Sequence, residues 1–235
     1  MIQQPKDKKM PEKRPKVLPG WKRALDVAFS LLAMPVLAAC TLLMATISPG
    51  PVIFRQQRVG YRGRRFMCFK FRTMRVEGGS RSHQPHPEQL IRSAAPMTEP
   101  NDWDKSRLVP CGSVIRASGL AGLPQVLNIL RGEMSLVGPR PCLPHEFERD
   151  LPWQQVRFNT LPGLTGPWRV FGNDRTTFDE MVRLDLRYSE NPTFWLDLKI
   201  IAMTIPALLQ QFRRAGTGQA GRAQTGRSER LNVGP

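Results

Sequence analysis

The 235-residue sequence has few cysteines and histidines, and neither type is grouped as a metal site requires. It contains no C-x-x-C pair and no histidine pattern beside a cysteine, which excludes the common zinc motifs and a compact disulfide framework. His83 and His86 lie in a Ser/Pro/Gln-rich stretch without a third ligand, so we interpret that stretch as a solvated loop. We expect reduced thiols and a cytosolic environment for the four cysteines, which are Cys40, Cys68, Cys111 and Cys142.

Acidic residues are also scarce, with 19 Asp and Glu against 35 Lys and Arg and a net charge of +16. Such a balance favours a phosphate-bearing partner, which leaves nucleic acid, an anionic membrane surface or a phosphorylated small molecule. No nucleic-acid recognition motif is found, and the basic clusters bracket an apolar run, so we predict no nucleic-acid binding. An apolar content of 40% is enough for one domain with tails.

Charge is absent altogether from residues 27–47, an apolar run of 21 residues. As a helix it would reach roughly 31 Å, the thickness of a bilayer core. Both flanks are strongly basic, so a simple span would translocate one of them against the positive-inside bias. A re-entrant hairpin that bends at Pro35 keeps both flanks beside anionic lipid on the cytoplasmic side. A bent single span and a buried helix of a soluble protein are the alternatives.

The chain divides by composition into four parts. Residues 1–19 form a basic disordered tail, residues 20–48 the re-entrant membrane helix, residues 49–213 a cytosolic domain with an irregular loop at 77–105, and residues 214–235 a second disordered tail. The predicted fold class is α+β and mostly helical: a membrane re-entrant helical hairpin plus a small cytosolic domain with a short β-hairpin.

Three elements of the domain carry clear local signals. Strands at 54–59 and 65–72 flank a Gly-Tyr-Arg-Gly turn, which predicts the β-hairpin. Pro124 and Gly132 suit the start and the C-terminal cap of a short helix over 124–131.

An apolar stripe at helical spacing predicts a last helix, either in the core or at the membrane interface beside Trp195 and Lys199. The stripe consists of Trp195, Leu198, Ala202, Ile205, Leu209 and Phe212.

Three basic residues are candidates for holding phosphate. Arg140 lies between two prolines in Gly138-Pro139-Arg140-Pro141, which limits its backbone freedom and suits bidentate binding, although a plain turn explains the same string. Lys70 and Arg72 share one face of the second predicted strand, where a solvated face is the simpler interpretation.

In their order along the chain, the motifs together resemble the bacterial sugar transferase family, the monotopic polyprenyl-phosphate phosphoglycosyl transferases. The resemblance covers about residues 20–212. It rests on Lys22-Arg23 with Asp26, the apolar run, SPGP at 48–51, FRQQRVG at 54–60, KFRTM at 70–74, LPQVLNILRGEMSLVGPRP at 123–141, PGLTG at 162–166 and LDLRYSENPTFWLDLKI at 184–200.

The resemblance implies transfer of a sugar 1-phosphate from a UDP-sugar to undecaprenyl phosphate, at the cytoplasmic face of the bacterial inner membrane. Family members start exopolysaccharide or other glycan assembly, need Mg²⁺, and use an Asp-Glu pair directly before Leu-Pro-Gln. The Asp attacks the phosphorus next to the sugar and the Glu helps hold the metal. The family's re-entrant helix is broken at a proline, and Pro35 is the matching residue.

This sequence departs from the pattern at the pair itself, where Ala121 and Gly122 replace the Asp and the Glu. Neither side chain offers a lone pair for attack or an oxygen for Mg²⁺, so we predict no metal ligand and no intact catalytic residue here. Glu133 is the next acid along the chain but is a poor substitute, roughly 18 Å away along a mostly helical path.

A phosphate site is still expected, formed by the start of the 124–131 helix with Gln125, by Arg140 and by the Lys70 and Arg72 strand. Two hypotheses follow. The protein is a transferase with another nucleophile, such as Ser118, or it is a non-catalytic relative that binds substrate or scaffolds polysaccharide assembly.

Overall fold

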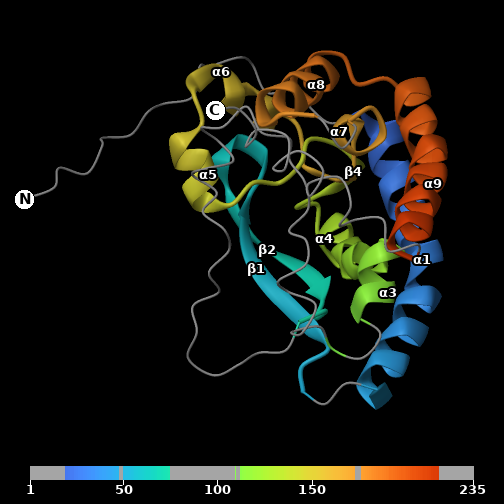
Figure 1. The fold of residues 1–235 in the computed structure, drawn as a ribbon. Coiled ribbons are helices and arrows are strands. Elements are labelled where there is room, and N and C mark those ends of the chain that lie inside the picture. Colours follow the sequence, from blue (N-terminus) through green and yellow to red (C-terminus); the bar gives the residue numbers. More distant parts are fainter. Residues whose placement is uncertain (1–18, 48–49, 75–108, 110–111, 173–175, 217–235) are drawn as a thin grey trace, which may run out of the picture.

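The computed structural model describes residues 19–47, 50–74, 109, 112–172 and 176–216. Within these residues the protein is mostly helical, with a two-stranded antiparallel sheet and a two-stranded parallel sheet (Figure 1). The predicted mostly helical class with a short β-hairpin is therefore confirmed. The predicted loop at 77–105 and most of both predicted tails lie outside the described residues.

The apolar run forms helix α1, Gly20–Ile47, which continues through Pro35. The predicted reversal at Pro35 is not confirmed. One stripe of α1 is buried on both sides of the proline, from Lys22 and Ser30 to Leu37 and Met44. Because this stripe packs on the same domain along its length, the chain keeps one direction past the proline.

The predicted β-hairpin is confirmed as β1, Ile53–Val59, and β2, Arg65–Phe71. The strands pair from Val59 opposite Arg65 to Ile53 opposite Phe71. Between them a short 3-10 turn, η1, spans Tyr61–Gly63. The hairpin packs against a 3-10 segment, η3, Leu120–Gln125, and the helix that follows it, α4, Val126–Leu130.

The helix predicted over 124–131 is therefore present, with its first residues in 3-10 form. Gly132 follows with a φ of +77°, the left-handed conformation that ends helices and that glycine adopts without strain. Figure 1 shows α4 between the hairpin and α1, and α4 contacts both.

The parallel sheet consists of β3, Ser135–Val137, and β4, Gly163–Thr165. A Cβ at Gly163 would collide with the backbone nitrogen of Gly138, so this close approach requires glycine. The remaining helices are α3, Gly112–Ala117; α5, Pro144–Arg149; α6, Pro152–Gln155; η4, Val156–Asn159; α7, Pro167–Val170; α8, Phe178–Glu190; and α9, Phe194–Gly216.

Helix α9 contains the predicted apolar stripe and runs three residues past the expected domain boundary at 213. It lies beside the N-terminal half of α1 (Figure 1). Buried Lys22 joins the two helices, because its Nζ donates to Asp197 Oδ2 at 2.5 Å, to Tyr188 Oη at 2.8 Å and to Val137 O at 2.9 Å.

Two apolar clusters form most of the core. One lies between the hairpin, the parallel sheet, α8 and α9, and contains Cys68, Ile129, Met134, Leu136, Val137, Tyr188 and Ile200. The other lies between α1, the end of β2 and α4, and contains Leu37, Met44, Phe71, Val109 and Val126.

Candidate phosphate-binding site

The positions of the missing acidic pair lie in η3, which packs against β2. The segment starts after Gly119, whose φ of +75° is left-handed. A Cβ at Gly119 would also lie 2.5 Å from Leu208 Cδ2 of α9, so the Leu208 side chain would have to shift, and the backbone conformation is the stronger reason for glycine there. Ala121 and Gly122 follow and are half-buried.

Gly122 has room for a side chain. A Cβ there would lie 3.2 Å from Gln125 Nε2 and 3.4 Å from Leu164 Cδ1, so a small movement of the Gln125 amide is enough to accept one. Gln125 itself is buried. The backbone around the pair therefore tolerates the acidic residue that this sequence lacks.

A cluster of cations, formed by Arg58, Lys70, Arg140 and Arg169, gathers near this segment. Arg58 and Lys70 share one face of the hairpin, because residues that alternate along paired strands point the same way. Arg140 follows β3 and Arg169 lies in α7, directly after β4. Parallel strands end at the same edge of their sheet, which brings these two arginines to one place.

Lys70 is the most perturbed member of this cation cluster. Burial lowers its pKa to about 8, and the nearby charges of Arg58, Arg140 and Arg169 act in the same direction. Among the described residues no hydrogen bond or ion pair of its ammonium group is found. Lys70 is half-buried, and an ammonium group in such a place beside other cations is stabilised by an anion.

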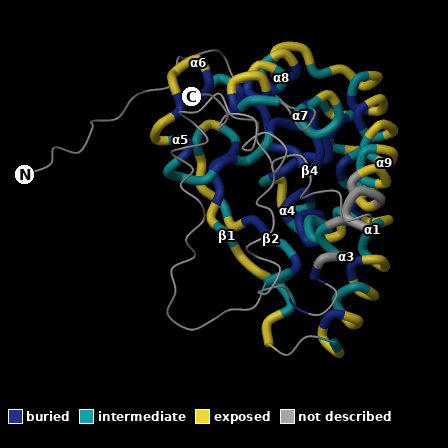
Figure 2. Tube along the Cα trace, in the orientation of Figure 1, coloured by how far each residue is buried: buried dark blue, intermediate teal, exposed yellow. Residues whose placement is uncertain are grey.

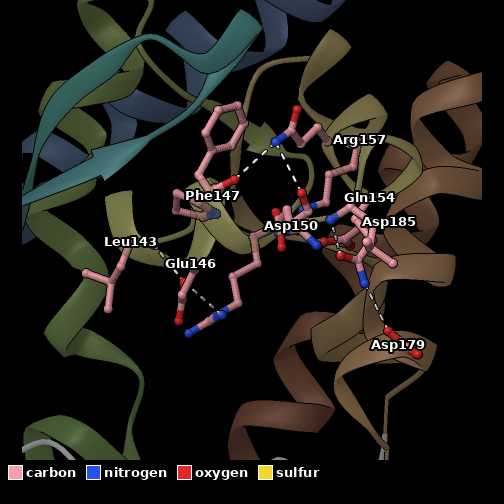
Figure 3. Close-up of polar contacts among 12 residues, drawn as sticks. Leu143, Glu146, Phe147, Asp150, Gln154, Arg157, Asp179 and Asp185 are labelled. Atoms are coloured by element: carbon pink, nitrogen blue, oxygen red, sulfur yellow. Dashed lines mark hydrogen bonds and ion pairs between the residues drawn. The ribbon is translucent and has the colours of Figure 1, made fainter. Parts of the chain in front are cut away.

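Arg140 is fixed from two sides. Its backbone amide donates to Asp185 Oδ2 at 2.9 Å, and its guanidinium lies 3.8 Å from Glu146 Oε2. Glu146 is the acid at the start of α5, where the same oxygen accepts a 2.7 Å hydrogen bond from the Leu143 amide (Figure 3). Arg58 holds the next residue of this segment, since its Nη1 donates to Pro141 O at 3.2 Å.

Asp185 lies in α8 and is fully buried. Burial raises its pKa to about 7, while the Arg140 amide and the charge of Arg157 oppose that rise. Arg157 is paired with Asp150 at 2.7 Å in the same region (Figure 3). Arg140, a member of the cation cluster, is thus held through its backbone amide by the buried carboxylate of Asp185.

The structure places some of the predicted site residues in the cation cluster and others outside it. Lys70 and Arg140 lie in one cluster, and their role in holding phosphate stays a prediction. Arg72 lies just beyond β2, where its amide donates to Val52 O and its guanidinium lies against Gly50. Pro35 is in the exposed part of α1.

Sequence reasoning missed four residues, namely Arg58, Arg169, Asp185 and Glu146. Two of them lie in motifs that carried the resemblance, Arg58 in FRQQRVG and Asp185 in LDLRYSENP. Their place in these motifs could have marked Arg58 and Asp185 as candidate site residues, whereas no motif or local pattern marks Arg169 or Glu146.

The donor set does not fit Mg²⁺. Magnesium takes oxygen ligands, usually carboxylates, and positions 121 and 122 provide no side-chain oxygen. No group of three His, Cys, Asp or Glu residues occurs in the part of the chain that the structure describes. Glu133 does not replace the pair, because its carboxylate accepts a 2.6 Å hydrogen bond from Asn128 Nδ2 behind η3.

A cavity of about 290 Å³ lies elsewhere, between α1, η1, α8 and the loop that precedes α9. Its lining includes Lys22 and Tyr188, whose polar atoms already hydrogen-bond to each other, and it includes none of the cation cluster. The charge and geometry of the cation cluster make it the better candidate site.

The fold and this site define an α+β protein with a long apolar helix and a partly buried cluster of cations. Comparison with known proteins agrees. The family described as bacterial sugar transferase matches residues 18–211, and the chain therefore belongs to the bacterial sugar transferase family.

Several curated relatives resemble the chain over about four fifths of its length. Exopolysaccharide production protein ExoY of Sinorhizobium fredii is 35% identical over 198 residues, which cover 80% of this chain and 84% of the relative. UDP-glucose:undecaprenyl-phosphate glucose-1-phosphate transferase of Caulobacter vibrioides is 36% identical over 200 residues, covering 80% of this chain and 69% of the relative. Galactosyl transferase CpsE of Streptococcus agalactiae is 35% identical over 195 residues, covering 80% of this chain but 42% of the relative.

Proposed function

We propose that the protein binds the diphosphate of a UDP-sugar, or polyprenyl phosphate, in the cation cluster and does not transfer sugar phosphate by its family's mechanism. The observation that carries this proposal is the presence of Lys70 and Arg140 in one cluster, with Lys70 on β2, the strand that packs against the segment of Ala121 and Gly122. The relatives named for UDP-glucose and undecaprenyl phosphate support the choice of ligands.

Binding follows from charge. A diphosphate beside Lys70, Arg58 and Arg140 would place an anion next to the Lys70 ammonium group, for which no ion pair is found among the described residues, and arginine forks bind phosphate oxygens in pairs. The two missing carboxylates would have repelled that ligand in the absence of a metal. Their replacement by Ala121 and Gly122 therefore leaves a site that favours the anion without Mg²⁺.

Transfer requires more than binding. In the family the attacking Asp forms a bond to the phosphorus next to the sugar while the bond to UMP breaks, and Ala121 has no atom that forms such a bond. Ser118 is the alternative nucleophile, and its hydroxyl donates to Ile115 O at 3.2 Å. No described base activates that hydroxyl.

We further propose that α1 inserts its outer face into the cytoplasmic leaflet of the bacterial inner membrane and keeps both of its ends at the cytoplasmic side, so that the segment is re-entrant in topology without a reversal at Pro35. Both ends of α1 pack on one domain, through Lys22 at the start and Met44 near the end. A span would draw that domain into the bilayer, whereas same-side insertion leaves both basic flanks beside anionic lipid.

One set of measurements tests the proposed function. Calorimetry with UDP-glucose and with a short polyprenyl phosphate should detect binding to the unaltered protein, and Lys70→Met should weaken it. UMP release with Mg²⁺ and undecaprenyl phosphate should be absent, and should appear in Ala121→Asp with Gly122→Glu if the remaining site is competent. No binding of either ligand refutes the binding proposal, and UMP release by the unaltered protein establishes the transferase alternative.

A further inference from the structure

We infer that α9 is a second membrane-contacting helix, whose outer face lies on the same lipid surface as the outer face of α1. The inference concerns the membrane surface of the protein and does not depend on the function proposed above. It starts from the direction in which the apolar stripe of α9 points.

The stripe faces away from the core. Trp195 is 75% exposed, Ile205 62% and Leu209 57%. The opposite face of α9 makes the contacts with the domain, through buried Asp197 and Ile200. A helix that turns its apolar stripe outward leaves a large apolar area without a partner in the described chain.

The outer face of α1 is apolar as well, with Leu32 78% and Leu42 70% exposed. By length and composition α1 is apolar enough to cross a membrane. Figure 2 shows exposed residues along the outer edges of both helices. The two outer faces meet at an aromatic cluster, where Phe194 lies edge-on to Trp21 and to Trp195 with ring centroids 5.5 Å apart in each pair.

Charge on this combined surface favours lipid. The sequence of α1 has no charged residue after Asp26, and the one acid of α9, Asp197, is buried at 1% exposure and paired with Lys22. Lys199 is exposed. No exposed carboxylate of the described part of either helix would therefore be buried in or repelled by anionic headgroups.

The aromatic cluster indicates the level of the headgroups. Tryptophan side chains concentrate at membrane interfaces because they combine an apolar body with a polar N–H. Trp21 and Trp195 lie at the N-terminal ends of the two helices, which the Trp21–Phe194 ring contact and the Lys22–Asp197 ion pair hold together, so both helices start at one level. Continuity with the α1 surface and the absence of exposed acids together favour a lipid surface over a second copy of the chain.

Quenching by bromolipids tests this directly. The full chain is reconstituted in vesicles of phosphatidylcholine and phosphatidylglycerol that contain dibrominated acyl chains. Trp195→Phe should remove part of the bromolipid-quenched fluorescence, whereas Trp153→Phe, on α6, should not. Because tryptophan to phenylalanine is a mild change, the result does not depend on a variant that fails to fold.

A matched pair of charge substitutions provides the second measurement. Leu209 and Leu151 are similarly exposed, at 57% and 54%, and Leu151 lies beside α6 rather than on this surface. Leu209→Glu should reduce the fraction of protein that stays on vesicles after an alkaline wash, and Leu151→Glu should leave it unchanged. Unquenched Trp195, or equal retention of the two variants, overturns the inference. If Leu209→Glu instead halves the particle mass in detergent without altering retention, the face binds a second copy, and the inference is equally overturned.

Discussion

Binding of a diphosphate to the cation cluster is expected to weaken as the pH rises through about 8, because Lys70 loses its proton there. Burial lowers the pKa of Lys70 to about 8 in the free protein, with Arg58 and Arg140 adding to the effect. An anion beside the ammonium group favours its protonated form, so binding takes up protons near this pH. The affinity for the diphosphate is therefore highest below the pKa that Lys70 has in the free protein, and it falls as the pH rises above that pKa.

The magnitude follows from the titration. With a pKa of about 8, the protonated fraction of Lys70 falls from about nine tenths at pH 7 to about one tenth at pH 9. The association constant for UDP should fall by up to about tenfold over that range, or about 1.4 kcal/mol.

One other group titrates near this range, because burial raises the pKa of Asp185 to about 7, and the Lys70→Arg variant keeps Asp185 and so separates its effect from that of Lys70. A terminal phosphate has its second pKa near 6, so it is ionised throughout this range. Burial raises the pKa of Cys68, so its thiol ionises less in this range than an exposed thiol would.

Calorimetry at pH 7, 8 and 9, in buffers of different ionisation enthalpy, measures both the affinity and the proton uptake. Lys70→Arg is the matched control, because a guanidinium stays charged at pH 9. That variant should bind UDP with little change between pH 7 and 9. An affinity independent of pH in the unaltered protein, or the same decline in Lys70→Arg, would refute this role for Lys70.

Three further changes test how the site is supported. Lys22→Met leaves the buried carboxylate of Asp197 without its cation and should lower the free energy of unfolding by about 3–5 kcal/mol, measured by thermal unfolding in detergent. Gly163→Ala forces a Cβ into the neighbouring backbone and should yield little folded protein, whereas Gly20→Ala, with nothing within 4 Å, should express normally. Asp185→Asn keeps an acceptor for the amide it binds and should retain UDP affinity, whereas Asp185→Leu should weaken it about tenfold or more in calorimetry.

Elements whose signals are local were predicted well from the sequence. The β1–β2 hairpin follows from two short strands around a turn with a glycine at each end, Gly60 and Gly63. The helix at α4 follows from Pro124 and Gly132, which fix backbone conformations within a few residues. Such signals act through φ and ψ and need no knowledge of the rest of the fold.

The members of the cation cluster could be predicted only in part, because they meet through tertiary contacts. Arg58 shares a face of the hairpin with Lys70 through the register of the strands, and Arg169 joins them because β4 ends beside β3. Neither relation is visible in the local sequence. The resemblance to a family supplied the positions of Ala121 and Gly122, which no spacing or periodicity would have marked.

Periodicity indicated a stripe on α9 but not the side to which it turns. A core helix and a membrane-surface helix show the same spacing of apolar residues. The structure shows that the stripe turns outward. Asp197 and Ile200 form the buried side of α9 that packs on the domain, and Ile205 of the stripe is exposed. For α1, Pro35 indicated a break, but the packing of Leu37 and Met44 beyond it keeps the helix continuous.

Loss of the acidic pair also predicts how binding depends on Mg²⁺. A diphosphate beside two carboxylates is repelled unless a divalent cation lies between them, whereas Ala121 and Gly122 create no such repulsion. UDP affinity of the unaltered protein should therefore be the same with EDTA as with Mg²⁺. In the variant with Ala121→Asp and Gly122→Glu, affinity should fall in EDTA and recover with Mg²⁺, since the space beside Gln125 admits the new side chain. Calorimetry of both proteins in both buffers checks this, with Ala121→Asn and Gly122→Gln as the uncharged control. Mg²⁺-dependent binding by the unaltered protein would mean that other residues hold the metal and that the site is not the metal-free anion site proposed above.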